Sequence, residues 1–524
     1  MPLATLSARL APFANEPYRD FTKPDAAQAS RHALAGVRAQ LGREYDLLIA
    51  GDRRRSSDKL HSLNPAHPAE VVGIHQKGST QDALDAVEAA YAFFPVWAAT
   101  AVEQRAEHLL RLAEIIRQRK SEFDAWLVVE AGKTWAESEA DVSEAIDFCE
   151  FYARQALKLA TPDPLVQLAG ERDELVYLPL GVGVIIPPWN FPLAILLGMT
   201  TAALVTGNTV VIKPSSDTPT IAAKFAEALL EAGFPPECFS LLTGSGAAIG
   251  DALVAHPKTR FVSFTGSRDV GLHINELAAK TPKGQLWIKR VVAEMGGKDA
   301  IIVDQDCDLD QAVLGVMYSA FGYQGQKCSA CSRAIVHQGV YDEFLDRLKS
   351  KTEQLTIGSP EEVENYLGPV INARAKESIL QYVEAGKTEG RLITGGEPAP
   401  GDGYFIRPTI IADIDPKARI FQEEIFGPVL AVTKAADFEQ ALAFANDSEY
   451  GLTGAVFSRD PQNIERAKEQ FFVGNLYINR KCTGAMVGAH PFGGFNMSGT
   501  DSKAGGPDYL LQFVQGKSIA QKIS

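Results

Sequence analysis

The sequence lacks any apolar run that could cross a lipid bilayer, which would take about 20 residues. Its longest apolar runs, such as Val182 to Pro188, are far shorter. The N-terminus also lacks the apolar core of a secretory signal, and the early acids Glu16 and Asp20 argue against a transit peptide. We therefore predict no membrane partner and a cytoplasmic location.

Basic charge and cysteine are also scarce. The chain has 51 Lys and Arg against 65 Asp and Glu, a formal net charge of −14 and a pI of about 5.3. Binding to nucleic acid needs a basic face, so we predict no nucleic-acid partner, although a local site for a small anion stays compatible with this charge. Six irregularly spaced cysteines indicate a reducing compartment without a disulfide framework. No metal is predicted, because the single C-x-x-C pair has no further ligands near it.

A G-x-G-x-x-G fingerprint is missing from every useful position, yet an alternating α/β pattern is present. A chain of 524 residues is too long for one core and predicts two or three domains. From Leu175 onward, short apolar runs alternate with helical segments, and a second stretch of this kind covers about 296–473. This alternation predicts parallel βαβ units in a doubly wound sheet, whose ligands lie beyond the carboxyl ends of the strands.

The expected elements are as follows. The first α/β stretch is predicted to have strands at 183–186, 209–212, 239–242 and 261–264, with helices at 192–206, 218–231 and 247–255. Before it we expect helices at 26–41, 80–93, 102–120 and 135–157, and short strands at 45–50 and 71–75. After it we expect strands at 300–303 and 334–337, and helices at 309–321, 341–354 and 437–446, with a long helix ending before Gly386. The tail 508–523 is either a closing strand or a strand added to a partner subunit.

The stretch from Gly325 to Arg333 contains the candidate nucleophile, Cys328. Lys327 precedes this thiol, and a neighbouring cation favours the thiolate, which is the nucleophilic form. A redox pair with Cys331 is the weaker hypothesis, because such pairs are expected near the start of a small βαβ domain. We interpret Cys331 as a small buried residue.

Three predicted strand ends carry polar groups. Asn190, in the turn after the first strand, could donate to a developing oxyanion, although by itself a turn-capping role is the simpler interpretation. Lys213 is equally compatible with a ribose or phosphate contact and with a solvated position. Thr265, Gly266 and Ser267 begin a helix, whose free N–H groups could bind an anion.

Two carboxylates complete the pattern. Glu294 precedes two glycines, and partial burial there would raise its pKa and make it a base toward water. The alternative for Glu294 is a surface glutamate before a turn. Glu424 could bind a diol, and its alternative is a charged loop. Together these groups fit one reaction. A thiolate adds to a carbonyl, Asn190 holds the oxyanion, a hydride leaves to a nicotinamide, and Glu294 activates water.

This constellation resembles the aldehyde dehydrogenase superfamily over essentially the whole chain. The shared motifs are PWNFP from Pro188, KPS from Lys213, FTGS from Phe264, EMGGKDA from Glu294, GQKCSACSR from Gly325, EEIFGPV from Glu423 and PFGGFNMSG from Pro491. The resemblance implies that Cys328 is the nucleophile, Glu294 the general base and Asn190 the oxyanion donor. It implies NAD as cofactor, with contacts from Ile186, Pro187, Pro188, Trp189, Lys213, Ser215, Ser216, Gly246, Phe264, Thr265, Gly266, Ser267, Gly296, Glu424 and Phe426.

The resemblance also implies a three-part α/β fold. A Rossmann-type cofactor domain would cover 1–157 and 178–295, and an α/β catalytic domain would cover 296–487. A small oligomerisation hairpin would be formed by 158–177 and 500–524. A homo-oligomer is implied, either a dimer or a hexamer built from dimers.

Within the superfamily, GQKCSACSR and the NRKCTGAMVG stretch from Asn479 are most similar to the L-glutamate γ-semialdehyde dehydrogenases. These enzymes make L-glutamate in the last step of proline degradation, which implies a small-molecule substrate and transient contact with a proline dehydrogenase. By this resemblance, Ser329, Gly484 and Ala485 hold the substrate carboxylate. Phe191 and Phe492 would sandwich its chain, Glu144 would lie near its amine, and Lys327 would lower the pKa of Cys328.

The sequence departs from the family in two places. Many relatives carry a glutamate three residues after the ribose-binding lysine, where it repels a 2′-phosphate. Here that residue is Ser216, which leaves NADP open as a cofactor. Many relatives also carry a second acid after the last loop motif, and Thr500 to Lys503 offers no clear equivalent. A CoA-acylating enzyme and a catalytically silent relative are the alternatives, and the presence of Glu294, Asn190 and Cys328 disfavours both.

Overall fold

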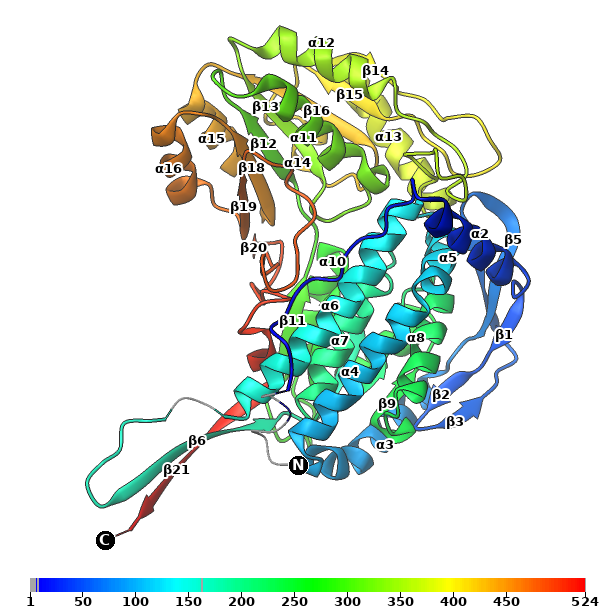
Figure 1. Cartoon of the computed structure of the whole chain (residues 1–524), viewed down its shortest axis with the longest axis vertical. Coiled ribbons are helices and arrows are strands. Elements are labelled where there is room, and N and C mark those ends of the chain that lie inside the picture. The colour runs from blue at the N-terminus through cyan, green and yellow to red at the C-terminus, as the bar shows by residue number, and fades with distance from the viewer. Residues whose placement is uncertain (1–5, 7–8, 162–163, 524) are drawn as a thin grey trace.

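The computed structural model describes residues 6, 9–161 and 164–523, and two seven-stranded sheets organise it (Figure 1). The first sheet has the strand order β11-β10-β7-β8-β9-β2-β3 and the second β14-β15-β16-β13-β12-β18-β19. Most neighbouring strands in both are parallel, and helices cover both faces. The doubly wound α/β architecture predicted from the sequence is therefore confirmed. The parts of the predicted domains at residues 1–5, 7–8, 162–163 and 524 lie outside the described residues.

The first sheet lies between two helical layers. Its strands are β2 (Leu47–Ile49), β3 (Asp52–Arg54), β7 (Val182–Ile186), β8 (Thr209–Ile212), β9 (Phe239–Leu241), β10 (Thr259–Thr265) and β11 (Arg290–Glu294). One face packs against α4 (Val102–Gln118), α5 (Lys120–Ala131), α6 (Trp135–Leu159), α7 (Ala194–Val205) and α8 (Pro219–Glu231). The other face packs against α3 (Thr80–Ala99), α9 (Asp251–Ala255) and α10 (Arg268–Ala279). Burial on both faces explains why these strands are continuous apolar runs.

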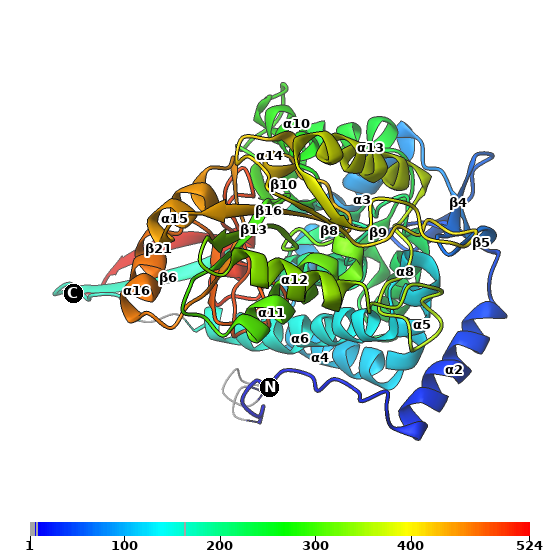
Figure 2. The ribbon, with the colours of Figure 1, turned by 90° about the horizontal axis from the view of Figure 1, so that it is seen from above.

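The second sheet is covered in the same way. Its strands are β12 (Asp299–Val303), β13 (Cys331–His337), β14 (Arg391–Thr394), β15 (Thr409–Ala412), β16 (Val429–Ala435), β18 (Thr453–Phe457) and β19 (Asn475–Ile478). Helices α11 (Leu309–Phe321) and α12 (Tyr341–Thr352) pack on one face. The other face holds α13 (Ala373–Glu389), α14 (Arg419–Gln422), α15 (Phe438–Asn446) and α16 (Pro461–Gln470). Figure 2 shows β13 and β16 between α11 and α12 on one side and α13 and α14 on the other. No described helix is both long and apolar enough to cross a membrane.

A two-stranded arm projects from the body beside the C-terminus (Figure 1). It consists of β6 (Glu171–Pro179) paired antiparallel with β21 (Val514–Lys522). The tail is thus a strand that pairs within its own chain, and its addition to a partner subunit stays a prediction. The remaining elements are α2 (Pro24–Arg38), the three-stranded sheet of β1 (Arg43–Tyr45), β4 (Lys59–Asn64) and β5 (His67–Gln76), and the pair β17 (Tyr450–Gly451) and β20 (Phe495–Asn496).

Two predicted helices were wrong in detail, and helices α5, α14 and α16 were missed. Helix α13 does not end before Gly386 but continues to Glu389, because the bare glycine packs against Ile411, whose Cδ1 would lie 2.4 Å from an added Cβ. The helix predicted for 247–255 begins as a π-helical turn at Gly246–Gly250 and becomes α-helical only from Asp251. Helix α5 was missed, because it is buried nearly all round and so shows no amphipathic period.

A buried carboxylate on α5 fixes the start of α8. The Glu130 side chain is fully buried, and it accepts hydrogen bonds from Thr220 N (2.7 Å) and Ile221 N (2.8 Å) in the first turn of α8. It also accepts one from Ser62 Oγ at 2.6 Å. These bonds satisfy helix N–H groups that have no partner within the helix. Since α8 follows the Lys213 loop, this contact places that loop against the rest of the sheet.

We predict that Glu130→Ala lowers the free energy of unfolding by about 3 kcal/mol, because three buried donors lose a charged acceptor. The shift of the urea midpoint measures this. Glu231→Ala is the control. Glu231 is the exposed last residue of α8, and its loss should change stability by less than about 0.5 kcal/mol. Equal shifts for the two variants would contradict the anchoring role of Glu130.

Candidate functional site

The carboxyl ends of β7, β8, β10 and β11 lie at one edge of the first sheet, because these strands are parallel and neighbouring. Asn190, Lys213 and Ser267 follow the ends of the first three, and Glu294 ends β11. Cys328 comes from the second lobe, by which we mean the part of the molecule built around the second sheet. It lies in the loop that leads into β13. The predicted site residues therefore meet where the strands of one sheet end and the second lobe begins, as expected for open α/β sheets.

Asn190 is joined directly to the nucleophile loop. Its side chain is buried, and its amide Nδ2 donates a hydrogen bond to the carbonyl of Gln326 at 3.0 Å. Gln326 lies two residues before Cys328 and is itself held by Ile371 N, which donates to its Oε1 at 2.9 Å. An amide nitrogen has two N–H donors, so one of them stays available to a further acceptor at the thiol.

The turn before Cys328 has an unusual backbone. Tyr323 and Gln324, within the 3₁₀ turn Gly322–Gly325, both have positive φ angles, of 49° and 55°. Residues with side chains rarely adopt such angles, and they persist only where the surroundings hold them. Here the Tyr323 hydroxyl donates to the Ala131 carbonyl at 2.9 Å, and Gln324 Nε2 donates to the Pro369 carbonyl at 2.8 Å.

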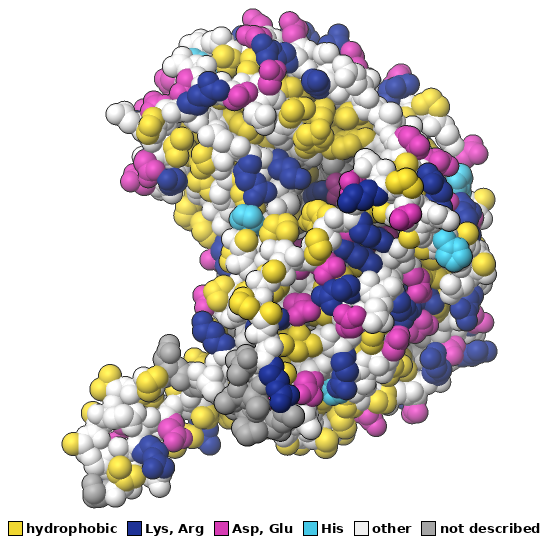
Figure 3. All heavy atoms as spheres, viewed as in Figure 1, with side chains coloured by type: hydrophobic (Ala, Val, Ile, Leu, Met, Phe, Trp, Pro, Cys, Tyr) yellow, Lys and Arg dark blue, Asp and Glu magenta, His cyan; other side chains and the backbone are white. Residues whose placement is uncertain are grey.

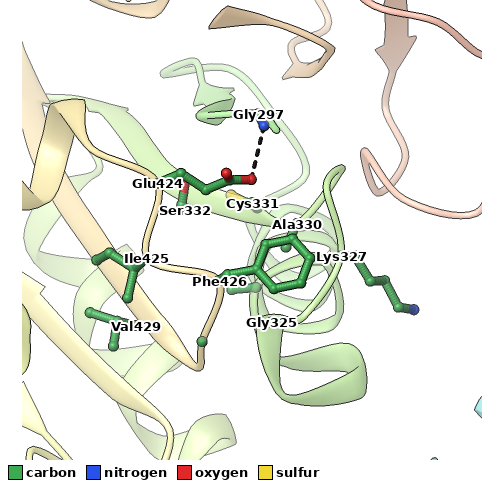
Figure 4. Close-up of a pocket in the computed structure, with 12 residues that line it drawn as sticks. Gly297, Gly325, Lys327, Ala330, Cys331, Ser332, Glu424, Ile425, Phe426 and Val429 are labelled. Carbon is green, nitrogen blue, oxygen red and sulfur yellow. Dashed lines mark hydrogen bonds between the residues drawn. The ribbon is translucent and has the colours of Figure 1, made fainter. Parts of the chain in front are cut away.

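The environment of the Cys328 thiol differs from the prediction. Burial raises the pKa of the thiol, and the nearby carboxylates of Asp299, Glu424 and Glu294 raise it further. Lys327 does not offset these effects: its ammonium is paired with the Glu137 carboxylate, and the two charged groups are 2.7 Å apart. In Figure 4 the Lys327 side chain extends away from the pocket that Cys331, Ser332 and Glu424 line. The thiol thus has a raised pKa and not the lowered one expected beside Lys327.

Glu294 has the surroundings of a general base. Its carboxylate is buried, and burial raises its pKa to about 7. The Ser502 hydroxyl donates to Oε1, and the backbone N–H of Gly494 donates a long bond of 3.4 Å to Oε2. These bonds act against burial and lower the pKa, so the group titrates near neutrality instead of higher. A carboxylate of this kind can take a proton from water at physiological pH.

Glu424 lies against the two glycines that follow Glu294. The backbone N–H of Gly297 donates to Glu424 Oε1 at 3.0 Å, as drawn in Figure 4. A Cβ at Gly296 would lie 2.1 Å from Glu424 Oε2, so only glycine fits there. At Gly297 an added Cβ would lie 2.4 Å from the Cys328 carbonyl. The glycines thus bring the carboxylate and the nucleophile loop together, and burial raises the pKa of Glu424 to about 7.

A second group of predicted contacts lies at the ends of β8 and β9. The Lys213 ammonium is buried, burial lowers its pKa, and its recorded hydrogen bond is a weak one to the Pro214 carbonyl at 3.3 Å. Nearby, Ser216 Oγ contacts the Gly244 carbonyl at 3.5 Å, and Ser215 Oγ accepts a bond from Asp217 N at 3.3 Å. A Cβ at Gly246 would meet no atom within 4 Å, so open space adjoins that turn.

The remaining predicted cofactor contacts line the same edge. Trp189 stacks edge-on against Phe426 of the second lobe, with ring centroids 5.4 Å apart, and Ile186, Pro187 and Pro188 lead into that turn. On β10, the Phe264 ring would clash with any side chain at Gly266. Thr265 Oγ1 contacts the sulfur of Met199 at 3.7 Å. Ser267 is the N-cap residue of α10, and its hydroxyl makes no capping hydrogen bond.

The predicted carboxylate anchors lie in two loops. Ser329 is buried, and its carbonyl accepts bonds from Cys482 Sγ at 3.3 Å and Thr453 Oγ1 at 3.4 Å. Gly484, with a φ angle of +77°, uses its carbonyl to accept a bond from Arg480 at 3.1 Å, and the half-buried Ala485 follows it. Figure 3 shows Lys and Arg side chains gathered in the hollow between the two lobes. An acidic chain thus has a locally basic hollow.

Of the two rings predicted to enclose the substrate's aliphatic chain, Phe191 and Phe492, only Phe191 has a ring contact among the described residues. Phe191 lies edge-on to Tyr323, with ring centroids 6.5 Å apart, and the Lys327 ammonium is 6.0 Å from its ring. Phe492 forms two backbone hydrogen bonds with Ala504, and no ring contact among the described residues joins it to Phe191. Burial, with the charge of Asp141, raises the pKa of Glu144 to about 8. The aromatic sandwich and the amine contact stay predictions.

Sequence analysis missed several residues that support the site. Lys133 and Asp141 form a fully buried ion pair behind Asn190, and Ser502 donates to the base. The sequence offers one indication for Lys133, a lysine after glycine at the end of an apolar run. It offers none for Ser502, because a loop serine has no periodicity that would mark its contact with Glu294.

Comparison with known proteins agrees with this geometry. The aldehyde dehydrogenase family matches residues 53–519. A 1-pyrroline-5-carboxylate dehydrogenase from Geobacillus thermodenitrificans is 56% identical over 510 residues, covering 97% of this chain and 99% of the relative.

Two solved structures share the fold closely. The crystal structure of 1-pyrroline-5-carboxylate dehydrogenase from Thermus with bound NAD matches with a TM-score of 0.96 and 48% identity, covering 98% of this chain and 100% of the other. Proline utilization A from Bdellovibrio bacteriovorus matches with a TM-score of 0.96 and 44% identity. The match covers 98% of this chain and 54% of that longer one.

We predict that alkylation of Cys328 by iodoacetamide rises with pH from 6 to 10 without reaching a plateau. The raised pKa keeps the group as a thiol below pH 9, so each pH unit increases the reactive thiolate about tenfold. Mass spectrometry of the labelled peptide, with Cys328→Ser as control, measures the rate. A plateau below pH 8 would show a thiol with a lowered pKa instead.

Proposed function

We propose that this chain, which belongs to the aldehyde dehydrogenase family, oxidises L-glutamate γ-semialdehyde, the open form of 1-pyrroline-5-carboxylate, to L-glutamate with NAD. The carrying observation is an identity of 53–56% over nearly the full length with 1-pyrroline-5-carboxylate dehydrogenases. The product is the one formed at the end of proline degradation. The enzyme is therefore proposed as an oxidoreductase of proline catabolism.

The residues at the edge of the first sheet fit NAD. Gly296 leaves room beside Glu424 that any side chain would fill, and the buried Lys213 ammonium has no acidic partner among the described residues. A carboxylate that accepts from ribose hydroxyls and a cation that donates to them would suit these two positions. The free N–H groups at Ser267, which begins α10, would suit a pyrophosphate. When bound, NAD supplies the hydride acceptor.

The other predicted contacts belong to the same proposal. Ile186, Pro187, Pro188, Trp189, Ser215, Gly246, Phe264, Thr265, Gly266 and Phe426 would shape the cofactor site. At Ser216 no carboxylate opposes a 2′-phosphate, so the proposal includes use of NADP beside NAD.

The reaction follows from the three central groups. The thiol must first lose its proton to a base, because its pKa is raised. The sulfur of Cys328 then adds to the aldehyde carbon, and the free N–H of Asn190 donates to the oxygen that becomes negative. Loss of a hydride from that carbon to the nicotinamide would leave the acyl group on the sulfur as a thioester. Glu294 then takes a proton from water, whose oxygen attacks the thioester; the C–S bond breaks, the Cys328 thiolate leaves, and the new carboxylate is released.

The two lobes suggest how the substrate is held. The semialdehyde carries an α-carboxylate, and we propose that Ser329, Gly484 and Ala485 bind it with a hydroxyl and backbone N–H groups. The basic hollow in Figure 3 favours the approach of an anion. Phe191 and Phe492 would enclose the aliphatic chain, with Glu144 at the end that carries the amine. Lys327, beside Cys328, is the remaining proposed residue of the substrate site.

The wider organisation of the chain is also part of the proposal. The cofactor domain would comprise 1–157 and 178–295, the catalytic domain 296–487, and the arm 158–177 with 500–524. The strand β21 is largely exposed along the arm, which supports assembly into a dimer or a dimer-based hexamer, and light scattering would decide between these sizes. Proline utilization A is a structural neighbour, and contact with a proline dehydrogenase is proposed on that basis. A cytoplasmic, reducing compartment would keep Cys328 as a free thiol.

We predict that 1-pyrroline-5-carboxylate gives NADH at least about tenfold faster, in kcat/KM, than an uncharged aldehyde of equal length, with glutamate as product. The carboxylate anchor causes this preference. Ser329→Ala should raise the KM for the semialdehyde about tenfold and leave the neutral aldehyde nearly unchanged. Equal rates on both aldehydes by the parent chain would refute the substrate. Equal effects of Ser329→Ala on both would remove Ser329 from the anchor.

We predict that Glu294→Gln still releases one NADH per subunit in a burst but turns over at least about 100-fold more slowly, because the thioester persists. In the parent, kcat should fall below pH 7, since the carboxylate with a pKa of about 7 must be deprotonated to act as a base. Stopped-flow absorbance of NADH measures the burst, and Cys328→Ala is the control without a burst. Full turnover by Glu294→Gln would place the base elsewhere.

A further inference from the structure

The Lys133–Asp141 ion pair has no part in the reaction described above, yet both of its side chains are completely buried. Lys133 follows α5 and Asp141 lies on α6, and both side chains have 0% exposure with Nζ 3.1 Å from Oδ2. Neither atom has a well-directed hydrogen-bond partner among the described residues, so the contact is mainly electrostatic. Burying two charges costs several kcal/mol per ion, and apolar residues often serve stability equally well. The pair therefore calls for a reason besides stability.

The lysine contacts both catalytic loops. Its ammonium lies 3.8 Å from the centroid of the Phe191 ring and 4.5 Å from that of Tyr323. Phe191 is the residue after Asn190, and Tyr323 begins the strained turn that leads to Cys328. A desolvated cation attracts aromatic faces more strongly than an exposed one. One buried lysine thus contacts a ring from each loop.

The aspartate fixes the far side of the Asn190 loop. Its Oδ1 accepts a hydrogen bond of 2.7 Å from the backbone N–H of Ala194, the first residue of α7. That N–H has no acceptor within the helix, and a negative charge at a helix N-terminus is favourable. The turn that carries Asn190 is therefore held on one side by its own strand β7 and on the other by Asp141.

The backbone around Lys133 holds the Cys328 loop as well. The carbonyl of Ala131, which ends α5, accepts the Tyr323 hydroxyl at 2.9 Å. The carbonyl of Gly132 accepts a longer bond of 3.4 Å from Gln324 Nε2. Both donors have positive φ angles that need such support. The same short turn between α5 and α6 thus supports the chain before the nucleophile.

We propose that Lys133 and Asp141 are positioning residues that set the distance between the Asn190 amide and the Cys328 thiol. They act on the two loops through Phe191, Tyr323 and the backbone of Ala194. They touch no substrate, because both are completely buried. The inference rests on the proposed function, in which Asn190 stabilises the oxyanion formed at Cys328. An ångström of misplacement at such a site costs about 100-fold in rate.

The chain contains a matched control. Lys120, at the other end of α5, pairs with Glu139 on α6 at 2.5 Å, and both side chains are also buried. This second pair holds the N-terminal segment through Arg19, whose Nε donates to Glu139 at 2.7 Å, and neither residue contacts a catalytic loop. A Lys→Met change at either end removes one buried cation from a buried carboxylate. Asp141 is then left without a cation among the described residues, whereas Glu139 keeps Arg19, so Lys120→Met is the milder of the two changes.

The experiment compares Lys133→Met with Lys120→Met in the full chain. Stopped-flow measurement of the NADH burst follows the step at Cys328 and Asn190, and thermal unfolding reports stability. We expect the burst to slow by at least about tenfold in Lys133→Met, with the KM for NAD within about twofold of the parent. Lys120→Met should keep its burst rate within about twofold although its unfolding midpoint falls. Asp141→Asn should slow the burst as well.

Other outcomes are decisive. An unchanged burst in Lys133→Met, or equal slowing by Lys120→Met, overturns the positioning role. If Lys133→Met does not fold, Tyr323→Phe decides, because it removes only the hydroxyl bond to Ala131: a burst slowed by threefold or more supports the proposal, and an unchanged one overturns it. The proposed function fails separately, if the parent makes no NADH from any aldehyde or if Cys328→Ala keeps its burst.

Discussion

The hydrogen bond from the Asn190 amide to the Gln326 carbonyl connects the turn after β7 with the loop that carries Cys328. These two loops belong to different sheets, and an oxyanion donor acts only within a few tenths of an ångström of its proper place. Much of the surrounding structure serves this alignment. The glycines at 296 and 297 let the second lobe approach, Trp189 lies edge-on to Phe426, and the buried Lys133–Asp141 pair contacts residues that precede or follow the two loops.

Burial governs the acid–base behaviour of the site. Glu294 and Glu424 both have pKa values raised to about 7, and Lys298 has a pKa lowered to about 7, chiefly because each is withdrawn from water. The same burial, with the neighbouring carboxylates, raises the pKa of Cys328. Cys328 is thus kept as a thiol. In the proposed reaction a base must take its proton, and the proposed base toward water, Glu294, titrates in the physiological range.

The expectation that a charged residue acts on its neighbour in the sequence failed where its side chain is paired with a distant residue. Lys327 adjoins Cys328 in the chain, yet its ammonium pairs with Glu137 on α6, 190 residues earlier. Successive residues of an extended loop point in different directions, so adjacency in sequence does not make a charge contact. Glu130 is the opposite case. A lone acid in an apolar helix gave no indication that it would accept the first N–H groups of α8.

The sequence by itself determined the doubly wound fold, most strands and helices of both sheets, and the identity of Cys328, Glu294 and Asn190 as the residues to examine. Apolar periodicity and strand-end polarity are local properties, so they can be deduced without coordinates. Only the tertiary structure decided which groups meet: Ser502 with Glu294, Glu424 with Gly297, and Lys133 with both catalytic loops. The directions of the pKa shifts were also decided there. Contacts between distant segments and the loss of water depend on how the two lobes pack, which no short stretch of the chain encodes.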